Sequence, residues 1–546
     1  MKGAALTAAL CALVATAPAG AATKLVVTGH GWGHGVGMSQ WGAYGYARHG
    51  WGWRRILAHY YGGTRVSPAP VSRVRVLVAE RAEREQVGCA GAIRVDDRTG
   101  RGHSLPPGSY AFGPALRLPV GHEKVRVRDG RRHRETFALV PVKRALRPPL
   151  VFDCPSAPLT LNGRPYHGLL VVRRAGHALS VVNSLALDDY VRGVVGGEMP
   201  DRWSMAALEA QAVAARSYAL ATLKPGESFD LYSDTRSQVY GGVAYETART
   251  NAAVAATAGK VLTWDGHVAT TYFFSTSGGR TADVHEVWPK APPVPYLRSV
   301  DDPYDGASPH HVWGPVVLDA QRVERKLGVP GGDVSVVRSP SGRVASLRIG
   351  ARVVDADRFR TELGLASTWF DVGELSLAGD RRQVLYGGRL ELATRVDGVS
   401  GAVLERRIGA GRWKTLKAVR GAEHVAVEPR AQTVYRLDAA GAHGPVFTVA
   451  VAPRLEVTPA GTALLDGAVE PRSRGAITVT RRVAGGWKVV ARPRLDAHGR
   501  FHVPLRLRRG AYRIAVEGDG RYAATARNLA VTPRLLASLS LEPSSG

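Results

Sequence analysis

One carboxylate stands in a setting that could give it acid–base chemistry. Glu198 follows two glycines at positions 196 and 197 and precedes Pro200, where we expect the junction between two helices. The glycines would let a large ligand approach, and Met199 and Trp203 could form a poorly solvated environment that raises the carboxyl pKa. A general acid needs such a raised pKa near neutral pH. The same features also fit a helix-terminal glutamate that caps a helix or pairs with an arginine.

Further candidates lie in the segment 29–63, which is rich in glycine and aromatic residues. His30 and His34 are four residues apart, but the intervening glycines argue against a helical metal-binding face, so we predict no zinc there. We expect a ligand-binding surface instead. Glycines let the backbone approach a ligand closely, while Trp32, Trp41 and the imidazoles offer stacking faces and hydrogen bonds.

An acidic segment surrounds Pro303. Asp301, Asp302 and Asp305 could bind a cation, but such residues more often form a solvated loop, and we expect the loop. We predict no metal and no cofactor for this chain.

The element that must position Glu198 is the helix after Pro200. Apolar residues recur there at spacings of three and four from Met205 to Ala219, with Ser204 available as N-cap. A second Ala-rich helix is expected over 246–258. Strands are expected over 260–264, 271–274 and parts of 334–349, so the region around Glu198 is predicted to be mixed α/β.

At 546 residues the chain is too long for one hydrophobic core. Residues 1–22 have the layout of a secretory signal peptide. The alternative is a membrane anchor, but the apolar run 4–17 is shorter than the roughly 20 residues that span a bilayer. We therefore expect a secreted protein. In an oxidising compartment an isolated cysteine pair is more often a disulfide than a metal site or a nucleophile, so we expect Cys89 to pair with Cys154.

The formal net charge is +27, from 73 Lys and Arg against 46 Asp and Glu. Such a field attracts anionic polymers. For an exported protein we expect anionic wall polymers as partners and no nucleic acid, although a coding bias towards arginine would produce the same solvated basic surface.

Two regions have the alternation of apolar and polar residues that is typical of strands. Residues 73–150 predict a small β domain. From about residue 371 short strands and turns alternate without a long helix, which predicts β-sandwich modules. A faint repeat aligns the segment around Trp413 with that around Trp487, and two Ig-like units meeting near Arg454 would account for it.

Several motifs together resemble the signature of the SpoIID/LytB family. They are residues 187–191 (LDDYV), 197–200 (GEMP), 207–219 (ALEAQAVAARSYA), 238–242 (QVYGG), 275–281 (STSGGRT) and 29–43 (GHGWGHGVGMSQWGA). The resemblance covers about half of the chain. In the common family layout the last of these segments follows the core, whereas here it precedes it. We therefore expect residues 29–64 to fold back onto the core 185–370, with His34 near Glu198.

The resemblance implies a function. Members of the sporulation branch are lytic transglycosylases of peptidoglycan glycan strands, and their catalytic acid maps onto Glu198. It also implies supporting catalytic roles for Arg216 and Tyr296. Substrate-binding positions are implied in the shared motifs, namely His30, His34, Ser39, Gln40, Gln238, Tyr240 and Ser277.

The resemblance also bears on zinc binding and on an alternative function. Some relatives bind zinc in the loop that corresponds to 230–240, but this chain has Tyr232, Arg236 and Ser237 there and no zinc is expected. Members of the LytB branch are enhancers of a cell-wall amidase, so a glycan-binding enhancer is the alternative function, with an amidase as partner.

The predicted fold class is α+β and multidomain, with a mixed α/β SpoIID-like core, a β-rich subdomain and C-terminal β-sandwich modules. The expected units are a signal peptide at 1–22, the Gly/His/Trp-rich segment at 23–64, the β-rich subdomain at 65–158, the core at 159–370, and sandwich modules at 371–453 and 454–535.

Overall fold

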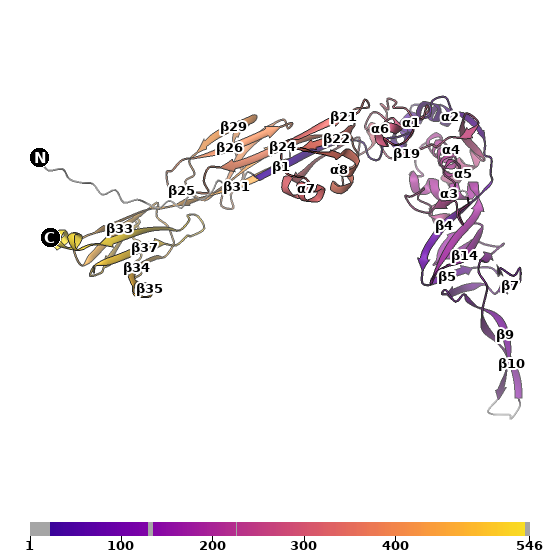
Figure 1. Cartoon of the computed structure of the whole chain (residues 1–546), viewed down its shortest axis with the longest axis horizontal. Helices are drawn as coiled ribbons and strands as arrows, with labels where there is room; N and C mark the ends of the chain where they lie inside the picture. Colours follow the sequence, from indigo (N-terminus) through magenta and orange to yellow (C-terminus); the bar gives the residue numbers. More distant parts are fainter. Residues whose placement is uncertain (1–21, 129–134, 225, 440, 541–546) are drawn as a thin grey trace.

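The structure is a computed structural model that describes residues 22–128, 135–224, 226–439 and 441–540. The expected signal peptide therefore lies outside the described residues, apart from Ala22. The molecule is elongated (Figure 1). Helices gather at one end, a long hairpin extends from that end, and β modules form the other end. No helix in the described part of the chain is long and apolar enough to cross a membrane.

The largest hydrophobic core combines helices with a β-sheet. The helices are α1 (Gln40–Arg48), α2 (Trp53–Tyr60), α3 (Leu187–Glu198), α4 (Met205–Ala221), α5 (Ala248–Ala256) and the short α6 (Val284–Val287). Leu208, Ala212 and Ala215, which recur at spacings of three and four in α4, are fully buried. Intervening residues such as Ala210 and Val213 are buried as well, so α4 is enclosed on nearly all sides and not along one face alone. The prediction for α4 is confirmed, although the Ser204 side chain makes no capping hydrogen bond.

A seven-stranded sheet packs against these helices. Its order is β16 (Leu231–Tyr232), β4 (Arg73–Ala82), β15 (Ala178–Ala186), β14 (Leu169–Ala175), β11 (Leu150–Asp153), β6 (Ile93–Asp96) and β7 (Gly102–Leu105). Strands from both sides of residue 158 pair directly in it, as β11 does with β14. The β unit therefore continues past the boundary expected at residue 158, up to the start of α3.

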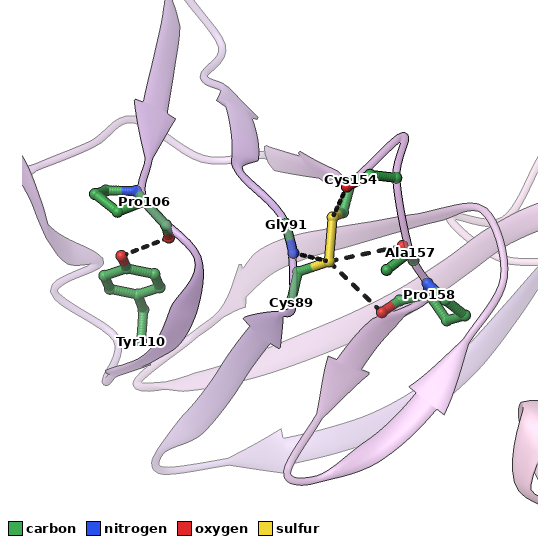
Figure 2. The surroundings of a disulfide bond; sticks show 8 residues. Cys89, Gly91, Pro106, Tyr110, Cys154, Ala157 and Pro158 are labelled. Carbon is green, nitrogen blue, oxygen red and sulfur yellow. Dashed lines mark hydrogen bonds between the residues drawn. A yellow bond between two sulfur atoms is a disulfide. The ribbon is translucent and has the colours of Figure 1, made fainter.

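A four-stranded sheet adjoins it, in the order β13 (Arg164–Tyr166), β12 (Leu159–Leu161), β5 (Glu85–Cys89) and β8 (Gly108–Phe112). Cys89, at the end of β5, forms a disulfide with Cys154 (Figure 2). The Gly91 N–H points to the Cys89 sulfur at 3.5 Å. The long hairpin consists of β9 (Arg117–Arg128) and β10 (Glu135–Ala145).

Small sheets tie the N-terminal segment to the core. β3 (Arg65–Pro68) pairs with β17 (Lys260–Trp264), which also pairs with β18 (His267–Val268). β2 (Met38–Ser39) pairs in parallel with β19 (Phe273–Phe274). The strand expected over 260–264 is confirmed as β17.

The first described strand, β1 (Ala22–His30), joins two further cores. It lies between β20 (Val312–Asp319) and β24 (Phe370–Gly379), and the sheet continues with β26 (Leu390–Asp397) and β29 (Gly421–Val427). Alternate residues of β1 face opposite sides. Leu25 and Val27 pack against residues 323–370, whereas Val26 packs against residues 375–451 of the β module that follows.

Residues 312–370 thus have a core of their own. The expected range 159–370 placed them in the core around Glu198, and that boundary is corrected. Their further elements are α7 (Ala320–Leu327), β21 (Val334–Arg338), β22 (Val344–Ile349), β23 (Arg352–Asp355) and α8 (Ala356–Leu363). The boundary expected at 370/371 falls at the start of β24, which serves both units. The sequence pattern missed this because pairing with β1 spans more than 340 residues.

Two β modules follow. The first adds the sheet β25 (Gln383–Leu385), β31 (Ala442–Ala452), β30 (Thr433–Ala439), β27 (Ala402–Ile408) and β28 (Lys414–Ala418). The second has a three-stranded sheet in the order β32 (Arg454–Pro459), β33 (Leu464–Glu470) and β36 (Arg500–Pro504). Its other sheet has the order β35 (Gly486–Ala491), β34 (Ile477–Val483), β37 (Gly510–Val516) and β38 (Thr525–Val531), and the helix α9 (Pro533–Ser540) follows. The two repeated segments are the hairpins β27–β28 and β34–β35.

Candidate active site

Glu198 is the last residue of α3, and the chain turns there before α4 begins at Met205. Pro200 explains the break, because proline cannot donate the N–H that a continuing helix requires. The turn leaves the Glu198 side chain at the edge of the helical core.

The Glu198 carboxylate lines a cavity of about 350 Å³. It is the one carboxylate among the described residues that line this cavity. The others are His34, Tyr218, Thr235, Ser237, Gln238, Val239, Tyr272, Phe273 and Trp288. The surface is therefore mainly aromatic and uncharged, which suits the apolar faces of sugar rings.

Burial raises the pKa of Glu198 above its ordinary value. Two hydrogen bonds oppose this shift, one from Gln40 Nε2 to Glu198 Oε2 at 3.1 Å and one from the Val239 N–H. Because the net direction is upward, the carboxyl group holds its proton to higher pH than a free glutamate does. That is the behaviour required of a general acid.

The N-terminal segment supplies part of this site. Gln40 is the first residue of α1, and the strand before it pairs with β19 of the core. His34 and Glu198 line the same cavity. The structure thus has the arrangement expected for a Gly/His-rich segment that folds back onto the core.

His34 is held in one tautomer. Its Nδ1 accepts the Val36 N–H at 3.0 Å, so its Nε2 carries the proton and donates to the Phe273 carbonyl at 3.1 Å. Burial lowers the pKa of His34 to about 4, although one side of the ring lines the cavity. Both nitrogens are therefore engaged with backbone atoms, and only the ring surface of the neutral imidazole can meet a ligand.

The glycines before Glu198 have a different role from the expected one. A Cβ on Gly196 would lie 1.8 Å from the Tyr245 carbonyl oxygen, and one on Gly197 would lie 2.5 Å from the Tyr245 ring. The missing side chains make room for the residue that ends the 3₁₀ helix η1 (Gly242–Tyr245), not for a ligand. The prediction that they open the site to a ligand is therefore corrected.

Arg216 does not contact Glu198. It is fully buried and pairs with Asp188 at 2.7 Å, and its Nη1 donates to the Lys260 carbonyl at 2.9 Å. The structure thus has Arg216 in a buried ion pair and not beside the candidate acid. Arg216 therefore joins α4 to the start of α3 and to β17.

Three more of the predicted site residues bind protein groups. The Tyr296 hydroxyl accepts the Thr270 N–H at 3.0 Å, and Tyr296 is not among the residues that line the cavity. Gln238 lines the cavity, but its Nε2 donates to the Tyr190 hydroxyl and the Ala215 carbonyl. The buried Tyr240 hydroxyl donates to Asn183 Oδ1 at 2.7 Å and does not line the cavity.

The remaining predicted positions also lie off the cavity lining. Ser39 caps α1 by accepting the Gly42 N–H at 3.0 Å. Ser277 is fully buried and donates to Asp305 Oδ2 at 2.8 Å. His30 packs 5.3 Å from the Trp369 ring. Direct ligand contact at these three positions has no support in the geometry, because their side chains are occupied or displaced from the cavity.

The prediction of a solvated acidic loop is wrong for Asp302 and Asp305. Asp302 and Asp305 are fully buried, and only Asp301 is exposed. Asp305 accepts hydrogen bonds from Ser277 and from His311 Nδ1 at 2.7 Å. Burial, followed by the charge of Asp305, raises the pKa of Asp302 to about 7. No group of three or more His, Cys, Asp or Glu in the described residues could hold a metal ion.

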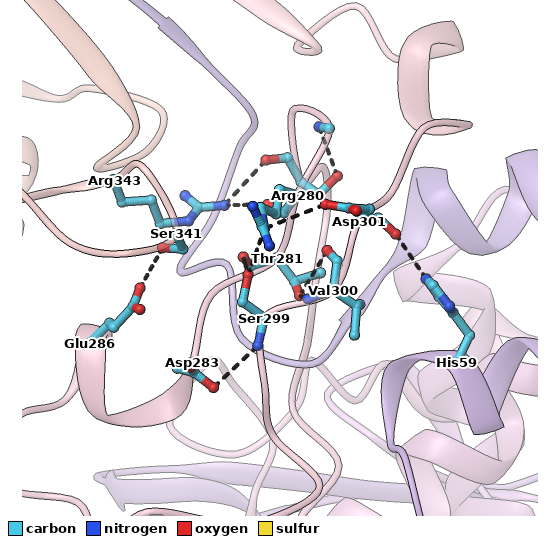
Figure 3. Close-up of polar contacts among 12 residues, drawn as sticks. His59, Arg280, Thr281, Asp283, Glu286, Ser299, Val300, Asp301, Ser341 and Arg343 are labelled. Atoms are coloured by element: carbon cyan, nitrogen blue, oxygen red, sulfur yellow. Dashed lines mark hydrogen bonds and ion pairs between the residues drawn. The ribbon is translucent and has the colours of Figure 1, made fainter.

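A buried arginine from the unit 312–370 braces a loop of the helical unit (Figure 3). Arg343 Nη2 donates to the carbonyls of Ser277 at 3.1 Å and Arg280 at 3.3 Å. Its guanidinium lies so close to Gly35 that an added Cβ would be 2.6 Å away. Burial lowers the pKa of Arg343 to about 10. The unit 312–370 thus supports the segment that carries His34.

Sequence reasoning did not assign several cavity residues, among them Tyr218, Tyr272 and Trp288. Tyr218 lies inside the quoted motif 207–219 and could have been singled out there. Tyr272 stands outside any motif, and its place depends on how β19 meets β2.

Known proteins can now be compared. Residues 175–264 match the family described as SpoIID, stage II sporulation protein. That range contains α3, Glu198 and α4. Over this range the chain is similar to the SpoIID family, so the expected resemblance to the SpoIID/LytB family is confirmed.

Several known proteins are similar to the chain. Stage II sporulation protein D of Bacillus subtilis is 34% identical over 212 residues, covering 35% of this chain and 61% of that protein. The protein of the same name from Bacillus amyloliquefaciens is 31% identical over 223 residues and is covered to 63%. The chain thus spans about three fifths of their length. The amidase enhancer of Bacillus subtilis is 39% identical over 136 residues, 25% of this chain and 18% of that protein.

Among solved structures, the titin fragment I67–I69 matches 27% of this chain and 60% of its own, at 10% identity and a TM-score of 0.14. A score this low carries no argument about the modules.

Proposed function

We propose that this SpoIID/LytB family member is an exported lytic transglycosylase that cleaves peptidoglycan glycan strands. The observation that carries the proposal is the lone carboxylate of Glu198 in a largely aromatic cavity, with its pKa raised by burial. The similarity to stage II sporulation protein D supports it.

A single carboxylate matters because most glycoside hydrolases use two. One protonates the leaving oxygen and the other acts as nucleophile or activates water. In the proposed reaction protonated Glu198 gives its proton to the glycosidic oxygen as the C1–O bond breaks. The ionised carboxylate then takes the proton of the substrate's own C6 hydroxyl as that oxygen bonds to C1. No water is consumed, the product is a 1,6-anhydromuramoyl end, and Glu198 returns to its protonated form.

The surroundings of Glu198 suit both steps. Burial favours the protonated form that begins the reaction, and the Gln40 and Val239 hydrogen bonds stabilise the carboxylate that follows proton transfer. The rings of Tyr218, Tyr272 and Trp288 can exclude water that would compete with the C6 hydroxyl.

The test compares the unchanged chain with Glu198→Gln on purified glycan strands, with and without stem peptides, and identifies products by mass spectrometry. Glu209→Gln is the matched control, because burial also raises the pKa of Glu209 but this residue does not line the cavity. We expect anhydromuramoyl ends from the unchanged chain and the control, and none from Glu198→Gln, which should still bind strands.

The similarity to the amidase enhancer favours a second function, binding of glycan to stimulate a cell-wall amidase. Intact strands that bind the unchanged chain and Glu198→Gln equally, together with faster amidase turnover in the presence of either, would establish the enhancer and refute the transglycosylase.

A further inference from the structure

The C-terminal module contains a groove lined by arginines. Its volume is about 750 Å³, and it lies where β34 begins and where β35 and β37 end. Two short Arg-x-Arg segments line it, with side chains exposed to solvent: Arg472 and Arg474 from one, Arg492 and Arg494 from the other. Glu517 is the one acidic residue among the described residues of its lining.

The four guanidinium groups are available to a ligand. Within the described ranges none of them forms an ion pair with an aspartate or glutamate. Exposed arginines elsewhere in the chain do, such as Arg236 with Asp234. Four unpaired positive charges around one groove repel each other, and an anion placed between them would relieve this repulsion.

The backbone that presents one pair is fixed without a ligand. Asp519 Oδ2 accepts the Arg474 N–H at 2.7 Å and the Ser473 hydroxyl at 3.1 Å. A Cβ on Gly475 would lie 1.8 Å from the Glu517 carbonyl oxygen, so the turn packs directly on the end of β37. Binding there needs little ordering of the main chain, which favours affinity.

The size and chemistry of the groove indicate its ligand. A volume of about 750 Å³ between four arginines is much larger than a single phosphate group needs, so several anionic groups of one chain fit it better. The planar guanidinium forks match the oxygens of phosphate in pairs. Residues 454–540 carry 16 Arg and Lys against 6 Asp and Glu, so the surrounding field also attracts a polyanion.

We propose that this groove binds a phosphodiester-linked anionic polymer of the cell wall. The Cys89–Cys154 disulfide indicates an oxidising compartment, where wall polymers rather than nucleic acids are the abundant polyanions. The groove lies at the opposite end of the molecule from α3 and α4 (Figure 1). It would hold the chain on the wall while the Glu198 cavity works at a distance, and it does not depend on which activity that cavity has.

The experiment uses the full chain and a variant in which the four groove arginines are changed to glutamine. The control variant changes four exposed basic residues of the same module that do not line the groove: Arg482, Lys488, Arg500 and Arg513 to glutamine. Both lose the same charge, and thermal unfolding verifies that both are folded. The probes are inorganic polyphosphate of defined length, intact cell walls, and walls stripped of phosphodiester polymers with hydrofluoric acid.

We expect the groove variant to bind polyphosphate and intact walls at least about tenfold more weakly than the unchanged chain. The reason is that four pairs between an exposed arginine and a phosphate group of the ligand are lost. The control variant should stay within about threefold, and stripped walls should bind all three proteins equally weakly. Equal losses in both variants would refute the groove, since net charge alone would explain binding. Groove-dependent binding to stripped walls would refute the phosphate ligand, and tighter groove-dependent binding to duplex DNA than to polyphosphate would assign the site to nucleic acid.

Discussion

The buried ion pair of Arg216 separates a structural role from a catalytic one. Arg216 has no exposed surface, and its guanidinium lies 2.7 Å from Asp188, whose side chain is 32% exposed. Removing one partner from a buried pair costs about 3–5 kcal/mol, because the other charge is left without compensation. Since a third of Asp188 remains in water, we expect the lower end, about 3 kcal/mol, for either Arg216→Met or Asp188→Asn.

The two single variants should therefore behave alike. Hydrogen exchange of the α4 amides measures the local free energy of unfolding without assuming that the whole chain unfolds in one step. We expect both variants to lower it by a similar amount, and the double variant Arg216→Met/Asp188→Asn to lower it by less than the sum, because neither charge then remains buried. Turnover per folded molecule should be nearly unchanged in all three.

A catalytic role for Arg216 predicts the opposite pattern. Arg216→Met would abolish turnover in protein that is folded and as stable as the unchanged chain, while Asp188→Asn would leave turnover intact. That result would refute the structural role.

Three further perturbations follow from the site and the fold. Gln40→Met removes a hydrogen bond that lowers the pKa of Glu198, so this pKa should rise. The alkaline limb of the pH–rate profile should therefore move to higher pH, and a limb that stays in place would contradict the hydrogen bond between Gln40 and Glu198. Replacing both Cys89 and Cys154 by serine opens a link across 65 residues and should cost about 4 kcal/mol of stability in the β unit, measured by urea unfolding, with the products of glycan cleavage unchanged. The His34 pKa of about 4 lies below its ordinary value of 6.5, so the unfolded chain takes up the proton first and stability should fall by up to about 3 kcal/mol as the pH drops from 6.5 to about 4. His34→Gln should remove this part of the pH dependence, and an identical dependence in the variant would contradict it.

Local patterns predicted the elements that depend on neighbours in sequence. The spacing of apolar residues in α4 and the short run Lys260–Trp264 that forms β17 are visible within a few residues, and both elements lie where the sequence indicates. The repeated hairpins around Trp413 and Trp487 were visible for the same reason. Glu198 was singled out as the candidate acid because its motif is compact.

Long-range packing decided what the sequence could not. β1 reaches across the chain to β20 and β24, and this pairing divides the range 159–370 into two cores. The glycines at 196 and 197 looked like space for a ligand, but only the fold places Tyr245 there. The buried state of Asp302 and Asp305 likewise depends on contacts with residues far away in sequence.

The sequence by itself determined the resemblance to the SpoIID/LytB family, the candidate acid and the kinds of element around it, because short contiguous motifs carry them. Only the tertiary structure decided which motif residues line the cavity and which are structural. Arg216, Tyr240 and Ser277 belong to the same motifs as cavity residues, yet their polar groups are satisfied inside the protein. A motif records that a residue type is needed at a position, whereas burial and hydrogen-bond partners, set by segments distant in the chain, decide what that residue does.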